Sequence, residues 1–131
     1  MDRAAYDDYL GKFNARDYAG FFAYYGEEPE LSFFGVTLRS LAEVERFYSF
    51  LHAYARETIR IVRFAASEEL VAVEATVRIE GLRALTAEAL AAAGYPQFHP
   101  LAVGEVIEMV QMIHYRMEQG RIASVQCALL D

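Results

Sequence analysis

The sequence has one cysteine, no tryptophan and no long apolar run. A single cysteine, Cys127, cannot form a disulfide within the chain. No apolar run approaches the roughly 20 residues that a helix needs to cross a bilayer. The acidic N-terminal segment lacks the basic and apolar regions of a signal peptide. These absences predict a cytoplasmic protein that does not associate with membranes.

Basic side chains and the usual motifs of cofactor chemistry are also scarce. The chain has 12 Lys and Arg against 19 Asp and Glu, a net charge of −7, and no basic run. Nucleic-acid binding depends on neutralising phosphates with Lys and Arg, so the composition argues against it. No Cys, His or carboxylate spacing matches a metal site, and no glycine-rich phosphate loop or nucleophile elbow is present. We therefore expect neither a metal nor a cofactor.

Aromatic residues are abundant by contrast. The chain of 131 residues is 55% hydrophobic and 24% charged, which predicts one globular domain over residues 1–131. It contains nine Phe and nine Tyr. Core packing accounts for most of the Phe but less well for so many Tyr, because each buried hydroxyl needs a hydrogen-bond partner. This composition favours an apolar pocket with hydroxyl groups at its edge.

Helical spacing dominates the first part of the chain. Residues 4–25 carry aromatic side chains at helical intervals, and Asn14 and Asp17 predict a break in the helix. We expect a second short helix from Tyr18, ending at Gly26.

A further helix follows a short strand or hairpin at residues 30–38. Ser40 and Glu43 form a capping box at its start, and we expect it to run through the segment "SLAEVERFYSFLHAYARE". His52 lies four residues after Tyr48, so both share one face of this helix.

After this helix, apolar side chains recur at every second residue rather than at helical intervals of 3.6 residues. We predict strands at residues 58–64, 70–81, 105–117 and 121–130, with a short helix around 86–93 between the second and third. Residues 70–81 alternate between apolar and polar side chains, which is typical of an antiparallel sheet with one apolar face. The order of elements predicts an α+β fold with the helices packed on one face of the sheet.

Four segments in this order carry a family resemblance: "YLGKFNARDYAGFFAYY", "RSLAEVERFYSFLHAY", "FHPLAVGE" and "IHYRMEQGRIASV". Together they resemble the nuclear transport factor 2-like superfamily, and within it the SnoaL-like and ketosteroid-isomerase-like branch. The resemblance implies a cone-shaped, curved antiparallel sheet packed on N-terminal helices, as in cystatin-like folds. It also implies an apolar pocket at the open end and a homodimer formed through the outer face of the sheet.

Ketosteroid isomerases provide a comparison at the level of residues. Their oxyanion-donating tyrosine matches Tyr9, and two supporting tyrosines match Tyr25 and Tyr48. The positions of their two catalytic aspartates match Phe33 and Ile113, which are apolar. The resemblance therefore implies a retained tyrosine cluster without the proton-carrying acids, and no ordinary ketosteroid isomerase activity.

The same match predicts which strand residues face the pocket. If Ile113 faces inward, alternate residues of its strand and of the neighbouring strands do so as well. We expect the ligand to contact Phe13, Tyr25, Phe33, Val73, Met109, Gln111, Ile113, Tyr115, Val125 and Cys127. The outer face of the sheet then carries Glu74, Arg78, Glu108, His114 and Arg116.

Two hypotheses for function remain open. In the first, the chain is a cofactor-free isomerase, cyclase or dehydratase that acts on a small apolar carbonyl compound. Tyr9 would then polarise the carbonyl with Tyr25 and Tyr48 in support, and His52 would be the acid or base. Alternatively, the tyrosines satisfy one another in the core, His52 bonds a neighbouring carbonyl, and the protein is a non-catalytic ligand-binding or dimerisation module.

Overall fold

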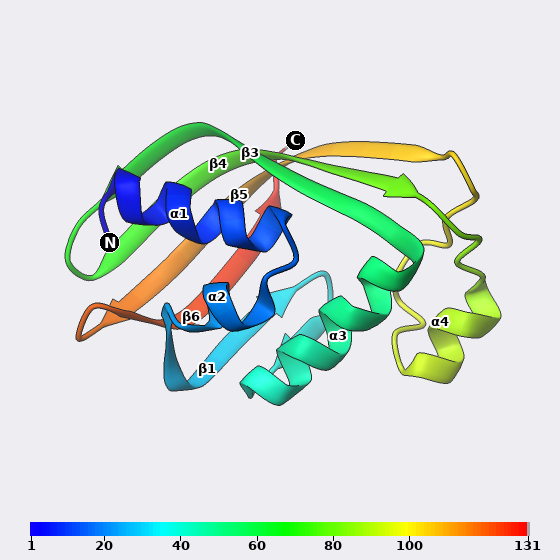
Figure 1. Ribbon diagram of the computed structural model, residues 1–131, viewed down its shortest axis with the longest axis horizontal. Helices are drawn as coiled ribbons and strands as arrows, with labels where there is room; N and C mark the ends of the chain where they lie inside the picture. The colour runs from blue at the N-terminus through cyan, green and yellow to red at the C-terminus, as the bar shows by residue number, and fades with distance from the viewer. Residues whose placement is uncertain (131) are drawn as a thin grey trace.

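The computed structural model describes residues 1–130, which form helices and one mixed sheet (Figure 1). The strands lie in the order β2-β1-β6-β5-β4-β3. The elements are α1 (Arg3–Asn14), α2 (Tyr18–Phe22), β1 (Tyr25–Phe33), β2 (Val36–Leu38), α3 (Leu41–Tyr54), β3 (Ala55–Ala66), β4 (Leu70–Gly81), α4 (Ala87–Ala93), β5 (Val106–Glu118) and β6 (Arg121–Leu129). Among these residues, no helix is both long and apolar enough to pass through a bilayer.

The predicted α+β architecture is confirmed. The sheet curves over α1, α2 and α3, and α4 lies beyond one end of it (Figure 1). Neighbouring strands are antiparallel except β1 and β6, which run parallel and pair Leu31 with Val125. A parallel pair cannot be closed by a tight hairpin, and here residues 34–120, which include the other strands of the sheet, connect the two strands.

The predicted helix starts agree with the structure, but two predicted helix ends do not. The Ser40 hydroxyl accepts a hydrogen bond from the Glu43 backbone N–H at 3.1 Å, as the capping box requires. The second helix ends at Phe22 rather than Gly26, because Tyr25 already pairs with Ile122 as the first residue of β1. Likewise, α3 ends at Tyr54 and β3 starts three residues earlier than the alternating pattern indicated.

The predicted alternation of inward and outward residues is correct for β4 and β5. On β4 the inward residues are at most 3% exposed: Val71, Val73, Ala75 and Val77. On β5, Gln111, Ile113 and Tyr115 are buried, whereas Met112, His114 and Arg116 are exposed. The pairing register places inward residues of neighbouring strands opposite one another. Ile113 pairs with Val73 of β4 on one side and with Cys127 of β6 on the other.

The free edge of β3 is covered by the end of α1. The Asn14 side chain accepts a hydrogen bond from the Ile59 N–H at 2.9 Å and donates one to the Ile59 carbonyl at 3.0 Å. The Arg16 guanidinium donates to the Ala55 carbonyl at 2.9 Å. These bonds satisfy backbone groups that an edge strand would otherwise leave without partners. Asn14 therefore does more than mark a turn, since it joins the helices to the sheet.

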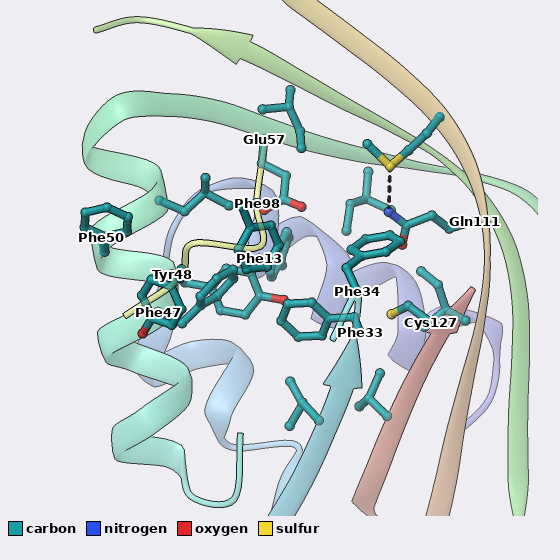
Figure 2. A pocket seen from close by; sticks show the side chains of 18 of the residues that line it. Phe13, Phe33, Phe34, Phe47, Tyr48, Phe50, Glu57, Phe98, Gln111 and Cys127 are labelled. Carbon is teal, nitrogen blue, oxygen red and sulfur yellow. Dashed lines mark hydrogen bonds between the residues drawn. The ribbon is translucent and has the colours of Figure 1, made fainter. Parts of the chain in front are cut away.

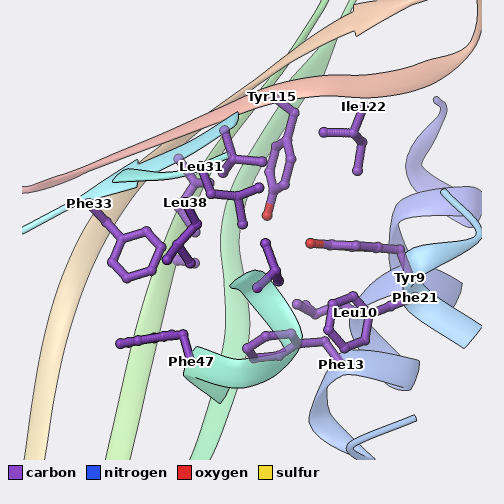
Figure 3. Packing of buried hydrophobic residues seen from close by; sticks show 14 of the residues in the cluster. Tyr9, Leu10, Phe13, Phe21, Leu31, Phe33, Leu38, Phe47, Tyr115 and Ile122 are labelled. Atoms are coloured by element: carbon purple, nitrogen blue, oxygen red, sulfur yellow. The ribbon is translucent and has the colours of Figure 1, made fainter. Parts of the chain in front are cut away.

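The core fills the space between the helices and the concave face of the sheet (Figure 3). Aromatic rings form much of it: Tyr9 and Phe13 of α1 pack on Phe21 of α2, with ring centroids 5.9 and 5.3 Å apart. On the far side, Phe33 packs on Phe47 at 5.2 Å. Continuous aromatic contact of this kind places the helices firmly on the sheet.

Replacing Asn14 with Ala tests the connection between α1 and β3. Both hydrogen bonds to Ile59 would be lost, so we expect the free energy of unfolding in urea to fall by about 1–3 kcal/mol. Lys12→Ala is the matched control on the same helix, because it removes an exposed ion pair with Asp8 and a contact with the Tyr24 ring at 5.6 Å, and it should leave the midpoint almost unchanged. Equal midpoints for the two variants would contradict this account of the edge.

Candidate functional site

A cavity of about 170 Å³ lies between the concave face of the sheet, α1, α3 and the loop after α4 (Figure 2). For comparison, an engineered apolar cavity of about 150 Å³ in another protein binds benzene. The space therefore suits one aromatic ring with small substituents. Phe34 (38% exposed) and His99 (side chain 74% exposed) both line it, so the mouth lies between the β1–β2 turn and the loop after α4.

Most of the residues that were predicted to contact ligand do line this cavity. They are Tyr9, Phe13, Tyr25, Phe33, Tyr48, Met109, Gln111, Ile113, Tyr115, Val125 and Cys127. Two do not. Val73 is 3% exposed and lies in the core beside Ile113, where the cone is already filled. His52 is also 3% exposed, and neighbouring side chains surround its ring.

Glu57, which was not predicted from the sequence, is the one carboxylate among the described residues that line the cavity. Its carboxylate points into the cavity from β3 (Figure 2), and its side chain is only 11% exposed. A signal for it exists in the sequence, since Glu57 is in phase with Ile59 and Ile61, the inward residues of β3. A charge on the apolar phase of a strand is uncommon and often marks a functional site.

His52 holds Glu57 in place. No loop separates α3 from β3, so the last turn of the helix and the first residues of the strand lie side by side. The His52 Nε2 is 3.0 Å from Glu57 Oε1, and its Nδ1 is 3.0 Å from the Tyr18 hydroxyl. An ionised carboxylate can only accept, so we assign the Nε2 proton to this bond and let Tyr18 donate to Nδ1. Both ring nitrogens are then engaged, and His52 reaches the cavity only through Glu57.

Four buried tyrosine hydroxyls form two separate hydrogen-bonded pairs rather than one cluster. Tyr9 bonds Tyr25 at 2.8 Å, and Tyr6 bonds Tyr115 at 2.7 Å. Among the described residues, no hydrogen bond joins Tyr48 to either pair. In each pair one hydroxyl donates to the other, so the second hydroxyl keeps a proton that it can donate to a ligand.

Burial keeps these groups protonated. It raises the pKa of the Tyr9, Tyr48 and Tyr115 hydroxyls well above 10.0, and the negative charge of Glu57 adds to this effect at Tyr48. Burial also raises the pKa of the Cys127 thiol to about 12. The tyrosines are therefore hydrogen-bond donors rather than bases, and the thiol is not a nucleophile at neutral pH. In the described part of the chain, no three His, Cys, Asp or Glu side chains gather as metal ligands would.

The curved sheet over N-terminal helices, with a largely apolar cavity on its concave face, is the arrangement expected of the nuclear transport factor 2-like fold. The chain belongs to the SnoaL-like domain family, because that family's model matches residues 6–125. The resemblance seen in the sequence is thereby confirmed. A search of the curated proteins found no match.

Solved structures show the same fold. A candidate polyketide cyclase from Xanthomonas campestris pv. campestris is 20% identical with a TM-score of 0.74, over 92% of this chain and 84% of that one. Another from Pseudomonas putida KT2440 is 24% identical with a TM-score of 0.73, over 93% and 86%. A candidate ketosteroid isomerase from Kribbella flavida DSM 17836 is 14% identical with a TM-score of 0.66, over 98% and 77%. At these identities the similarity concerns the fold.

The buried tyrosines predict a loss of stability at alkaline pH. Their pKa values are above 10.0 in the folded protein and near 10.0 in the unfolded chain. The folded state thus binds more protons than the unfolded state above pH 10.0, and the free energy of unfolding falls as pH rises. We expect phenolate absorbance at pH 10.0 to show clearly less than half of the nine tyrosines ionised while circular dichroism remains native. Half ionisation in the folded state would contradict this burial.

Proposed function

We propose that the protein binds a small, neutral, mostly apolar carbonyl compound and transfers a proton at the carbon next to the carbonyl. Isomerisation, cyclisation and dehydration all begin with this step. The observation that carries the proposal is the Glu57 carboxylate, which faces a largely apolar cavity and is held by His52. A positioned carboxylate in a site of this kind is the usual means of abstracting such a proton.

The other polar groups of the cavity support a division of roles. Glu57 takes the proton from carbon, and the electron pair moves onto the carbonyl oxygen as an enolate. The Tyr9 hydroxyl, when it accepts from Tyr25, donates a hydrogen bond to that oxygen and stabilises the charge while keeping its own proton. Protonated Glu57 then returns the proton to another carbon of the same molecule, or to a hydroxyl that leaves as water.

His52 has a different role in this proposal from the one expected from sequence. It positions the carboxylate and does not touch the ligand. Tyr18, at the other end of the hydrogen-bonded chain, is half-buried. The two hydrogen bonds that link Glu57 to His52 and His52 to Tyr18 thus fix the orientation of the Glu57 carboxylate and connect it toward the surface.

The charge and size of the cavity limit the substrate. No Lys or Arg side chain is among the described residues that line it. A carboxylate or phosphate ligand would be buried without a counter-charge and beside Glu57, which is unfavourable. The volume suits one ring, so a four-ring steroid would not fit. The apolar Phe33 and Ile113 agree with this, and we expect no ordinary ketosteroid isomerase activity.

The second candidate is a binding protein without catalysis. The same cavity would hold the ligand, and Glu57 would accept a hydrogen bond from it without removing a proton. This alternative makes the same prediction for binding but the opposite one for exchange of hydrogen between ligand and water. Exchange therefore separates the two functions.

Phenylacetone in heavy water is a direct probe, because its hydrogens beside the carbonyl exchange when the ketone enolises. We expect the protein to accelerate deuterium uptake, measured by proton NMR. Glu57→Gln should slow it by about 100-fold or more, since the base is lost, while binding of the ketone changes little. Glu88→Gln is the control, because Glu88 is an exposed carboxylate on α4. Uptake by Glu57→Gln at the wild-type rate would contradict the proposed role. Binding without acceleration by either protein would favour the non-catalytic alternative.

We also propose that the protein forms a homodimer through the outer face of the sheet. Val106 and Met112 of β5 are each 44% exposed on this face, and Met112 is the outward residue next to His114. Exposed apolar side chains on an otherwise charged sheet are typical of an interface.

Met112→Glu tests this interface without touching the cavity. We expect sedimentation velocity to show a dimer for the wild type and a monomer for the variant, because a buried unpaired carboxylate is unfavourable. Glu88→Gln again serves as the control and should remain dimeric. A wild type that sediments as a monomer at high micromolar concentration would contradict the proposed homodimer.

A further inference from the structure

The hydroxyl of Tyr95 has no hydrogen-bond partner. Among the described residues it is the one buried side-chain polar atom in this situation, and the residue is only 5% exposed. Buried hydroxyls in folded proteins are nearly always paired, because an unpaired one has lost water and gained nothing in return. An exception on the wall of a cavity calls for a physical explanation.

The backbone and the ring of Tyr95 are both held by neighbouring groups. Gly94, with φ at 93°, ends α4, and the Tyr95 N–H then bonds the Leu90 carbonyl at 2.8 Å. This arrangement fixes the Tyr95 backbone to the helix end. The ring packs edge-on against Phe47 with centroids 5.0 Å apart, and the Arg46 guanidinium lies 5.4 Å from its centre.

The backbone and the ring make all of these contacts, and the hydroxyl makes none of them. Phenylalanine would make the same ones and would avoid the unpaired hydroxyl, so packing alone does not explain tyrosine at this position. Tyr95 does, however, line the same cavity as Glu57. The missing partner is therefore best supplied by the molecule that occupies the cavity.

We propose that Tyr95 determines specificity by bonding a second oxygen of the ligand. This inference rests on the proposed function, because it adds a requirement to the same ligand. The substrate class becomes one-ring ketones that carry a further hydroxyl or carbonyl group on the ring. Their carbonyl is served by Glu57 and Tyr9 and their second oxygen by Tyr95, while Phe33, Phe47 and Phe98 surround the ring.

Tyr95→Phe separates stability from recognition. Without a ligand, we expect this variant to have a higher urea midpoint than the wild type, because the unpaired hydroxyl is gone. The wild type should bind para-hydroxyphenylacetone about tenfold more tightly than phenylacetone, and the variant should bind both alike. Isothermal calorimetry or NMR titration measures both ketones. Tyr6→Phe is the matched control, since its hydroxyl is bonded to Tyr115 and its loss should lower the urea midpoint.

Each of the other results overturns the inference. A lower midpoint for Tyr95→Phe would mean that the hydroxyl has a partner in solution, such as a bound water. A preference for the hydroxylated ketone that survives in the variant would mean that another group recognises that oxygen. Equal binding of both ketones by the wild type would refute the role of Tyr95 and leave the proposed function intact. Binding of neither would refute both.

Discussion

The direct passage from α3 into β3 is the constraint on which the cavity depends. A carboxylate in apolar surroundings is tolerated only with a partner, and the absence of a loop at Ala55 brings His52 within 3.0 Å of Glu57. The strand is fixed on both sides of this residue. Arg16 bonds the backbone at Ala55 and Asn14 bonds it at Ile59, so the break between the first two helices and the position of the charge are parts of one arrangement.

Hydrogen bonding between hydroxyls explains how the core near the Glu57 carboxylate can contain so many tyrosines. Four buried hydroxyls satisfy one another in two pairs, which lets a largely aromatic core contain polar groups at little cost. Burial holds the tyrosines and the Cys127 thiol in their neutral forms. A site with one carboxylate and several neutral donors results, and those are the groups that enolate chemistry uses. Tyr95, which has no partner, is the departure from this pattern.

Sequence periodicity predicted what depends on local spacing. The capping box at Ser40 and the alternation along β4 followed from short segments, and the structure agrees. The inward phase of β5 and the family came from the resemblance, and the family model over residues 6–125 confirms the family. Tyr25 was placed in a helix because its apolar neighbours continue the helical pattern, whereas its pairing with Ile122 is a long-range contact. Glu57 was missed because the helix was extended over it, which concealed its phase. The contacts of His52 and the unpaired hydroxyl of Tyr95 are tertiary properties, so no local pattern could predict them.

The covered edge of β3 also bears on how this protein avoids joining other chains. An edge strand with free backbone groups can recruit a strand from another molecule and begin a fibril. The end of α1 blocks this on β3 only as far as Ile59. Along the rest of the strand, the long charged side chains of Arg60 and Arg63 stand exposed, and Arg63 pairs with Glu74 of β4 at 3.1 Å. Charged side chains on an edge strand disfavour pairing with a second copy. The strand that carries the acidic group of the cavity thus relies on a helix for one half of its protection and on arginine for the other.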